Sequence, residues 1–400
     1  MNKHDWLESL KDSATPSLDE CILYLGDTFP LLHQFKNTPQ DPIWHAEGDV
    51  HIHTDMVLHE LYQIFATEQY RPSPDNRQIL ILAALLHDIA KPITTTVDEN
   101  GRVRARKHEE LGLNYLTLRI LELELPTNSV IQILNLVGYH QKPKLLVIKN
   151  EAKTEYLKLC NIVNYELIYW LEIADMKGRF CEDLEEQLMY LDEFYTLCQE
   201  YMSSYDNDLQ YLEDDSIYNK QVGHYQIVHG DMSSFSEATT KFYKYTYNNS
   251  HFVMTVGISG SGKSTLANTV YPFYHVVSLD NIRKAFYQGS CKRSKEIEGR
   301  VMQEAKEMLK TAWNAKVNVV LDATNLRREL REQILTLAHN YHARTTIHVL
   351  LKTKVQILKQ NKQRFVEIPE EVIEKQITKF QLPTNNESHE VIYDITYDKK

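Results

Sequence analysis

A glycine-rich stretch from Gly257 to Thr265 reads GISGSGKST and carries the residue types that bind nucleotide phosphates. It matches G-x-x-x-x-G-K-[ST], in which backbone N–H groups surround the phosphates, the lysine reaches them and the hydroxyl binds Mg²⁺. The β-prone run HFVMTV precedes it, and a helix can start at Ser264. Motif and context together predict a site for ATP or GTP with Mg²⁺. The residues expected to form it are Gly257, Ser259, Gly260, Ser261, Gly262, Lys263, Ser264 and Thr265.

Two aspartates follow later β-prone runs, Asp280 after HVVSL and Asp322 after VNVVL. Functional side chains gather where parallel strands end. An aspartate after a second strand, such as Asp280, can accept the proton of a hydroxyl that receives a phosphoryl group. Asp322 could hold Mg²⁺ through water or could pair with Arg283. Arg364 lies in QNKQRFVEIPEEVIEKQITKFQLP, in which a Pro-started helix and then a second Pro follow the arginine, and this segment suits a lid over the phosphates.

Histidines and carboxylates mark the helices of the N-terminal half. In ILILAALLHDIAKP, His87 and Asp88 follow a long apolar run, so two candidate metal ligands lie beside an apolar surface that excludes water. Lys91 shares their helix face, and Arg179 shares the face of Asp175 four residues earlier. Imidazole and carboxylate groups together suit Mn, Fe, Co, Ni or Zn. The candidate ligands are His53, His87, Asp88, His108, His140 and Asp175.

Apolar periodicity predicts that residues 1–200 are almost entirely helical. The helices are expected at Asp55–Glu68, Arg77–Ile89, His108–Leu123, Ser129–His140, Glu155–Met176 and Asp183–Tyr201.

After residue 250, β-prone runs alternate with helices, which predicts a parallel sheet with helices on both faces. Strands are expected at Phe252–Val256, His275–Ser278, Val317–Leu321, Thr345–Leu350 and Val391–Thr396, and helices at Lys295–Ala315, Arg327–His342 and Glu370–Phe380. The chain is therefore expected to be multidomain, with an all-α domain over 1–204, a partly structured linker over 205–250 and an α/β P-loop domain over 251–400. Aromatic residues of the linker (Phe242, Tyr243, Tyr245, Tyr247) could stack on bases or pack against a domain.

Composition supports two domains with different electrostatic tasks. Residues 251–400 hold 23 Lys and Arg against 16 Asp and Glu, a difference of +7, and residues 1–250 hold 21 against 39, a difference of −18. A basic half suits a polyanionic substrate, unless the charges are spread over solvated faces. A basic cluster that could hold a nucleic-acid backbone is formed by Arg327, Arg328 and Arg331. These residues could equally be one solvated face of a helix. The five scattered cysteines and the absence of a long apolar run predict a cytoplasmic protein without a membrane segment.

Four separated motifs in the N-terminal half, HAEGDVHIHTDMVL, LLHDIAKP, KHEELG and ADMKGR, resemble the HD phosphohydrolase superfamily. More specifically, they resemble the HD domain appended to bacterial CCA-adding tRNA nucleotidyltransferases. The resemblance implies an all-α domain that binds one or two metals and hydrolyses phosphomonoesters and 2′,3′-cyclic phosphodiesters. It favours His53 over the neighbouring His51 as the first ligand. His45 and Glu47 either support that ligand or belong to a turn.

The same resemblance implies a role for each matched residue. His53, His87, Asp88 and Asp175 match the core ligands. The additional ligands of two-metal members match His108 and His140, and the basic residues that hold the phosphate match Lys91 and Arg179.

In the C-terminal half, SLDNIR, DATN and NKQRFVEIPEEVI resemble the 5′-hydroxyl polynucleotide kinase family. The likeness implies that Asp280 is the general base, Arg283 holds a neighbouring phosphate of the acceptor, and Arg364 stabilises the transferred phosphoryl group. Adenylylsulfate kinases and toxin-like P-loop kinases share parts of this pattern.

The order of the two modules resembles the bacterial HD-Pnk end-healing enzymes, which implies RNA or DNA ends as substrates. The sequence contains no K-x-D-G ligase motif, so joining would need a separate ligase. Two alternatives remain: a kinase and phosphohydrolase acting on free nucleotides, and an NTP-gated module that only binds nucleic acid.

Overall fold

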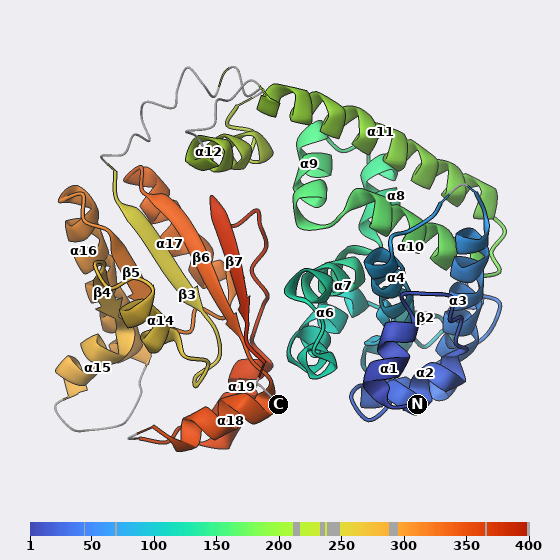
Figure 1. Cartoon of the computed structure of the whole chain (residues 1–400), viewed down its shortest axis with the longest axis horizontal. Coiled ribbons are helices and arrows are strands. Elements are labelled where there is room, and N and C mark those ends of the chain that lie inside the picture. The colour runs from blue at the N-terminus through green and yellow to red at the C-terminus, as the bar shows by residue number, and fades with distance from the viewer. Residues whose placement is uncertain are drawn as a thin grey trace. The chain divides into compact units, whose positions relative to one another are not determined.

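The computed structural model divides the chain into two compact units, Met1–Ser203 (unit 1) and Ser204–Lys400 (unit 2), each described here by itself (Figure 1). The structure describes residues 1–43, 45–68, 70–210, 217–232, 237, 249–287, 295–364 and 366–397. In this part of the chain, no helix combines the length and the apolar character needed to cross a membrane.

Unit 1 is built around helix α4 (Pro74–Leu86), whose residues from Arg77 to Leu86 are all buried. A helix that is apolar on every side can only be stable when other elements surround it. Helices α3 (Val50–Ala66), α7 (Thr127–Tyr139) and α10 (Tyr165–Lys177) pack against it. Ser73 caps its N-terminus, and Pro74 occupies the first turn, where no amide donor is missed.

The remaining elements of unit 1 are short helices, one hairpin and the long α11. In chain order they are α1 (Lys3–Ser9), α2 (Leu18–Leu25), η1 (Pro30–Asn37), α5 (Lys91–Thr94), β1 (Thr95–Val97), β2 (Val103–Ala105), α6 (His108–Arg119), η2 (Ile120–Leu123), α8 (Lys142–Ile148), α9 (Lys153–Ile162) and α11 (Leu184–Gln210).

Two local features differ from the sequence-based expectation. The single helix expected over Glu155–Met176 is broken into α9 and α10, because Val163 is extended and the Asn164 side chain accepts the amide protons of Glu166 and Leu167. The antiparallel hairpin of β1 and β2 was not predicted, since three-residue strands carry too little alternation to be recognised.

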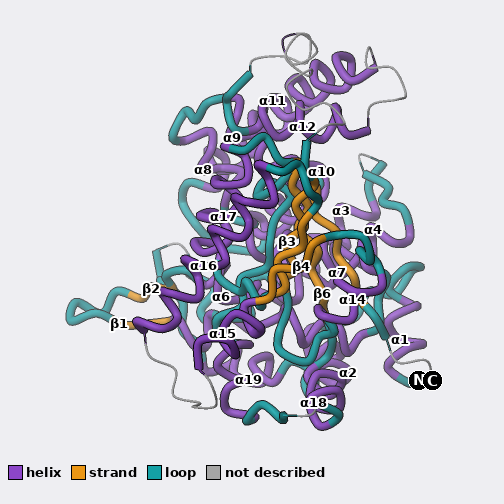
Figure 2. Tube along the Cα trace, turned by 90° about the vertical axis from the view of Figure 1, so that its left-hand side faces the viewer, coloured by secondary structure: helices purple, strands orange, loops and turns teal. Residues whose placement is uncertain are grey.

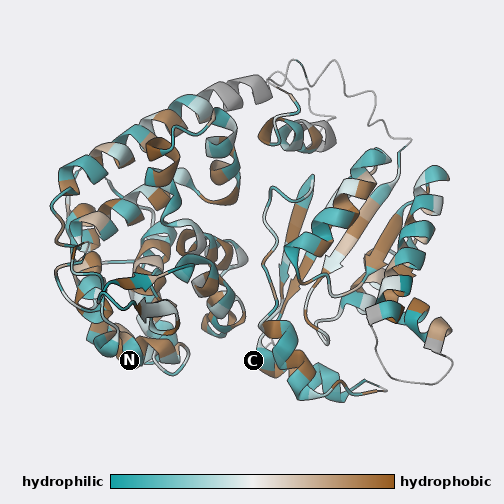
Figure 3. Cartoon of the chain, turned by 180° about the vertical axis from the view of Figure 1, so that it is seen from behind, coloured by the Kyte–Doolittle hydropathy of each residue, from teal (hydrophilic) through white to brown (hydrophobic). Residues whose placement is uncertain are grey.

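Unit 2 contains the expected α/β architecture, which confirms the predicted fold class. Its five parallel strands lie in the order β4-β5-β3-β6-β7. The strands are orange in Figure 2 and largely hydrophobic in Figure 3. Strands β3 and β6 are almost entirely buried, whereas the edge strand β7 is half-buried. The elements are α12 (Ile217–Val228), β3 (His251–Val256), α14 (Lys263–Thr269), β4 (His275–Ser278), α15 (Leu279–Tyr287), α16 (Lys295–Asn314), β5 (Val319–Asp322), α17 (Arg328–Asn340), β6 (Arg344–Leu351), α18 (Lys354–Lys362), α19 (Glu370–Ile377) and β7 (Glu390–Ile395).

Helices cover both faces of this sheet, as the alternation of side chains along β3 requires. Val253 packs against Ala267 of α14 on one face. Phe252, its neighbour in the strand, contacts Trp313 of α16 on the other face, with ring centroids 5.3 Å apart.

Residues 205–250 fall partly outside the described residues, and the aromatic residues from Phe242 to Tyr247 lie among those that are not described. Within this stretch, Tyr225 of α12 contacts His339 and His389 of unit 2, with ring centroids 4.7 and 4.9 Å apart.

The basic cluster that we considered on α17 is not a basic surface. Arg331 is fully buried, and its guanidinium donates two hydrogen bonds, of 2.6 and 2.9 Å, to the buried carboxylate of Glu387. Arg328 pairs with Glu332 on the surface. The spacing of the arginines did not reveal that one of them belongs to the core.

Candidate metal centre and nucleotide-binding site

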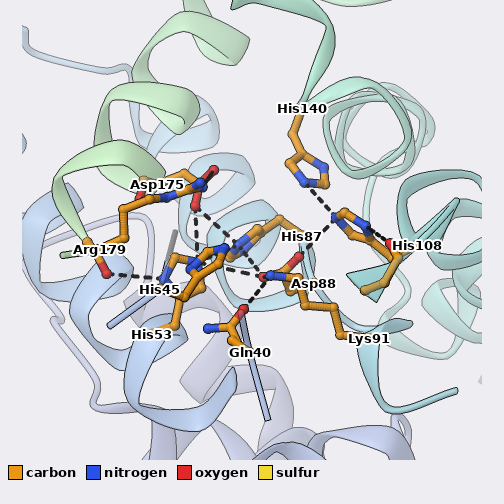
Figure 4. Close-up of polar contacts among 12 residues, drawn as sticks. Gln40, His45, His53, His87, Asp88, Lys91, His108, His140, Asp175 and Arg179 are labelled. Carbon is orange, nitrogen blue, oxygen red and sulfur yellow. Dashed lines mark hydrogen bonds and ion pairs between the residues drawn. The ribbon is translucent and has the colours of Figure 1, made fainter. Parts of the chain in front are cut away.

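Four of the candidate ligands converge inside unit 1 (Figure 4). His53 comes from α3, His87 and Asp88 follow α4, and Asp175 comes from α10. His53 Nε2 lies 3.3 Å from His87 Nε2, 3.0 Å from Asp175 Oδ1 and 3.6 Å from Asp88 Oδ2. All four side chains are buried. They come from residues that are up to 122 positions apart in the sequence.

The histidines of this centre are oriented by carbonyl oxygens. His87, His108 and His140 each place Nδ1 at 2.7 to 2.9 Å from the carbonyl oxygen of the residue three positions earlier. His53 Nδ1 lies 3.1 Å from the carbonyl oxygen of Gly178. A proton on Nδ1 satisfies these contacts and leaves the Nε2 lone pair directed into the centre, as metal-binding histidines require.

Asp88 connects this group to a second one. Its Oδ1 lies 3.2 Å from His108 Nε2, which in turn lies 3.3 Å from His140 Nε2. Two unprotonated nitrogens at this distance cannot form a hydrogen bond, but they can share a cation. Asp88 Oδ1 and Asp175 Oδ1 are buried and have no hydrogen-bond partner among the described residues. The donor set therefore fits one or two divalent cations, with Asp88 placed to bridge them.

The charge state of the two aspartates agrees with this fit. Burial raises the pKa of Asp88, but the neighbouring His87 and Lys91 outweigh it and hold the pKa well below its ordinary value. Burial also raises the pKa of Asp175, but the neighbouring Arg179 lowers it, and this pKa too lies well below its ordinary value. Both groups are thus carboxylates at neutral pH.

Two predicted phosphate-binding residues lie beside these carboxylates. Lys91 Nζ lies 2.7 Å from Asp88 Oδ2, and Arg179 forms an ion pair with Asp175. Sequence reasoning missed a third buried pair, in which Lys144 Nζ lies 3.9 Å from Glu172 Oε2. Burial raises the pKa of Glu172 to about 8. No motif marked these two residues, and only their position on the buried faces of α8 and α10 could have identified them.

The structure shows where His51, His45 and Glu47, whose roles the sequence left open, lie relative to His53. His51 lies outside the cluster, with Nε2 at 3.0 Å from Asp19 Oδ1. Glu47 lies inside it, and its Oε1 is 3.1 Å from His53 Nδ1 and 2.8 Å from His45 Nδ1. Glu47 therefore helps to hold the His53 ring, with His45 behind it.

The glycine-rich loop of unit 2 lies between β3 and α14, which begins at Lys263. Gly260 and Gly262 have φ angles of +91° and +102°, which favour glycine. A Cβ at Gly260 would lie 2.9 Å from the carbonyl oxygen of Ile357, so this loop also needs a close approach to α18. The loop backbone thus depends on these two glycines.

Lys263 and Ser264 turn from this loop into the site. The Lys263 ammonium donates a 2.9 Å hydrogen bond to the Ile258 carbonyl oxygen, and burial lowers the pKa of the lysine to about 8. The Ser264 hydroxyl donates a 2.7 Å hydrogen bond to Asp322 Oδ2. Asp322 therefore sits beside the hydroxyl that is expected to bind Mg²⁺, and of the two alternatives it does not pair with Arg283.

Arg283 instead pairs with Asp280, its neighbour on α15. Its guanidinium also donates two 2.9 Å hydrogen bonds to the carboxylate of Glu298 on α16. This fork fixes the plane of the guanidinium, whereas the Asp280 side chain remains 64% exposed and open to an acceptor. Glu298 was not predicted, because it lies fifteen residues further along the chain.

These groups line one cavity of about 660 Å³. The cavity brings together the glycine-rich loop and the predicted Asp280, Arg283, Asp322 and Arg364. It also includes Lys352, which follows β6 and could have been found by the strand-end rule that pointed to Asp280. Gln376 of α19 accepts a 2.8 Å hydrogen bond from the Ser259 amide, so the expected lid segment touches the loop.

Comparison with known proteins matches a separate domain to each unit. The HD domain family matches residues 50–165, and the family described as AAA domain matches residues 252–383. The first range holds five of the six candidate ligands, and the second holds the glycine-rich loop, Asp280, Asp322 and Arg364.

Individual relatives are distant. A "putative bifunctional polynucleotide kinase/RNA ligase" of Autographa californica nuclear polyhedrosis virus is 32% identical over 149 residues, which are 34% of this chain and 21% of the viral protein. A chain of the Pnkp1/Rnl/Hen1 RNA repair complex is 26% identical, with a TM-score of 0.31, and the match covers 34% of this chain and 45% of that one. A putative kinase from Chloroflexus aurantiacus is 11% identical, with a TM-score of 0.32, over 38% of this chain and 87% of that one.

The viral match spans about a fifth of that protein's length. The two domain matches show that the chain carries an HD domain followed by a P-loop domain of the AAA type. Part of its sequence is also distantly similar to the viral protein described as a putative bifunctional polynucleotide kinase/RNA ligase.

Proposed function

We propose that the chain is a bifunctional enzyme that heals the ends of nucleic acids. Unit 2 phosphorylates 5′-hydroxyl ends with an NTP, and unit 1 removes 2′,3′-cyclic, 2′- and 3′-phosphates. The observation that carries the proposal is the presence of two distinct sites for phosphate chemistry in one chain. One is a P-loop cavity with an exposed aspartate, and the other is a bridged cluster of imidazoles and carboxylates. The described relationship of the viral protein to polynucleotide kinases supports the nature of the acceptor.

In the kinase reaction, Lys263 binds the phosphates of the NTP, and Ser264 and Asp322 would hold its Mg²⁺. Asp280 accepts the proton of the acceptor hydroxyl as that oxygen attacks the γ-phosphorus. The bond from the γ-phosphorus to the β–γ bridging oxygen breaks, and the nucleoside diphosphate leaves. Arg283, oriented by Glu298, binds the neighbouring phosphate of the acceptor.

Arg364 lines the same cavity and neutralises charge on the transferred group.

In the phosphohydrolase reaction, the six candidate ligands would hold one or two divalent transition metals. Such metals supply Lewis-acid chemistry and lower the pKa of water. Lys91 and Arg179 bind the oxygens of the phosphate and exchange their present contacts with Asp88 and Asp175 for it. Glu47 and the backbone carbonyls keep the imidazole rings in the orientation that the metals require.

The test compares substrates of different size. The wild-type chain should transfer the γ-phosphate of an NTP to a 5′-hydroxyl oligonucleotide with a kcat/KM far above that for the free nucleoside. A preference for the nucleoside would contradict the proposed acceptor and favour a small-molecule kinase. Hydrolysis of 3′-phosphate and 2′,3′-cyclic phosphate ends is assayed in parallel with added Mn²⁺, Co²⁺ or Ni²⁺.

A further inference from the structure

Unit 1 contains a cavity of its own, and the short strand β2 and its ends carry basic residues that line it. The hairpin of β1 and β2 leads directly into α6 and its first residue, His108. Along β2 and its ends, Arg102, Arg104 and Arg106 (the hairpin arginines) are exposed, whereas the residues between them are half-buried. This alternation of exposure is that of a strand with one solvated face. All three hairpin arginines line the same cavity, which has a volume of about 500 Å³.

The charge of this cavity is opposite to that of the surrounding sequence. Residues 1–250 hold 39 acidic against 21 basic side chains. Among the described residues, the cavity is lined by six lysines and arginines and by one carboxylate, Asp41. Three of these cations, Lys91, Lys144 and Arg179, pair with the buried Asp88, Glu172 and Asp175, so the excess positive charge is that of the hairpin arginines. Such a concentration of one sign inside a concave wall attracts anions. The six cationic residues are Lys91, Arg102, Arg104, Arg106, Lys144 and Arg179.

The hairpin arginines are weakly engaged by the protein itself. Arg102 Nε lies 3.6 Å from Asp41 Oδ2, and Arg104 Nη2 lies 3.8 Å from Asp98 Oδ2. Both distances exceed those of a good hydrogen bond, and exposed pairs of this kind contribute little stability. Arg106 has neither an ion pair nor a side-chain hydrogen bond within the described part of the chain. These guanidinium groups are therefore available to another anion.

Their spacing fits a chain of phosphates. Alternate residues of a strand repeat every ~6.6 Å, close to the separation of successive phosphates in an extended single strand. A cavity of about 500 Å³ is large enough for one terminal nucleotide. Lys91 and Arg179 line it as buried residues that contact the candidate metal ligands Asp88 and Asp175, whereas the hairpin arginines line it as exposed residues.

We propose that the hairpin arginines bind the phosphodiester backbone of a single-stranded nucleic acid whose phosphorylated 3′ end enters the cavity. This inference rests on the proposed phosphohydrolase function and assigns the residues that bind the polynucleotide upstream of its 3′ end. A free nucleotide carries no upstream phosphates and would not use the hairpin.

The test replaces all three side chains in the full-length chain (Arg102→Gln, Arg104→Gln, Arg106→Gln). Substrates are short RNA and DNA oligonucleotides with a 3′-phosphate, and the matching 3′-mononucleotides. Both oligonucleotides carry a 5′-phosphate, so the kinase has no acceptor. For a single strand, each phosphate contact makes the affinity fall with about the 0.7 power of the salt concentration. Relative to about 1 M salt, three contacts therefore raise the affinity at about 0.1 M salt by about 100-fold, and one contact raises it by about 5-fold.

The triple variant should therefore show an oligonucleotide KM that is about 5- to 100-fold higher and less dependent on salt, with an unchanged mononucleotide KM. The control variant, Arg71→Gln, Arg119→Gln and Lys153→Gln, removes the same charge from residues of unit 1 that do not line the cavity. It should keep the wild-type values. RNA and DNA arms separate a requirement for the 2′-hydroxyl from backbone binding alone.

An equal oligonucleotide KM in the wild type and the triple variant would overturn the inference, and so would an equal loss in both triple variants. Failure of the proposed function looks different, because the wild type would then hydrolyse neither substrate. Fluorescence anisotropy with the same oligonucleotides still decides the inference in that case, since tighter binding by the wild type than by the hairpin variant supports it and equal binding refutes it.

Discussion

Gly178 is the residue through which the fold of unit 1 sets the geometry of the metal centre. It caps α10 with a φ of −78°, so it is not needed for an unusual backbone angle. A Cβ there would lie 2.8 Å from the backbone nitrogen of Val57 and 2.9 Å from its Cα. Since Val57 belongs to α3, the substitution Gly178→Ala must push α3 and the end of α10 apart.

The size of the effect follows from these distances. Ordinary contacts begin near 3.4 Å, so the two backbones must separate by roughly 0.5 Å or more, and overpacking of this kind costs about 1–3 kcal/mol. The same movement stretches the 3.1 Å contact between His53 Nδ1 and the Gly178 carbonyl oxygen. Loss of such support for a metal ligand lowers metal affinity or activity by about 10- to 100-fold.

Gly178→Ala should therefore lower the calorimetric transition of unit 1 and its phosphohydrolase activity together, and leave 5′ phosphorylation intact. Gly112→Ala is the matched control, because a methyl group on that helical glycine would meet only side-chain carbons, the nearest at 3.3 Å. A Gly178→Ala protein with wild-type metal content and hydrolysis would refute the argument that this close approach positions His53.

Three further outcomes are expected. His140→Ala should lower the metal content per chain, measured by elemental analysis, without abolishing it, because it removes a ligand from one side of Asp88 only. Burial lowers the pKa of Lys263 to about 8, and bound phosphates raise it again. NTP binding should therefore take up a proton above pH 8, seen by calorimetry in buffers of different ionisation enthalpy, and weaken as pH rises. Arg331→Met should destabilise unit 2 by about 3–5 kcal/mol, because it leaves Glu387 buried without its ion pair. Adding Glu387→Leu should restore only part of this loss in thermal unfolding, because three backbone carbonyls still lack the guanidinium donor.

The elements that carry strong local signals could be predicted from sequence. The strand at His275–Ser278 has the predicted bounds, and the strand before the glycine-rich loop differs by one residue. Apolar runs bounded by turn residues define such strands without reference to tertiary contacts. The helical stretch predicted over His108–Leu123 has those bounds, as α6 followed by η2. Other helix bounds in unit 1 differ from the prediction by several residues, because caps such as Asn164 depend on single side chains.

The parts of the sites that were not predicted depend on contacts between distant segments. Glu298 holds Arg283 from another helix, and Lys144 meets Glu172 from α8. The buried pair of Arg331 and Glu387 joins residues 56 positions apart. Residue types and spacing cannot reveal such partners, because they are set by how the helices pack.

The central claim is that one chain heals both ends of a nucleic acid with two independent sites. It is tested most directly with one RNA oligonucleotide that carries a 5′-hydroxyl and a 2′,3′-cyclic phosphate, incubated with NTP, Mg²⁺ and Mn²⁺. The wild type should produce a 5′-phosphate and a 3′-hydroxyl. Lys263→Ala and Asp280→Ala should heal only the 3′ end, and Asp88→Ala only the 5′ end. A folded single-site variant that loses both reactions, or a wild type that alters neither end, would contradict the account.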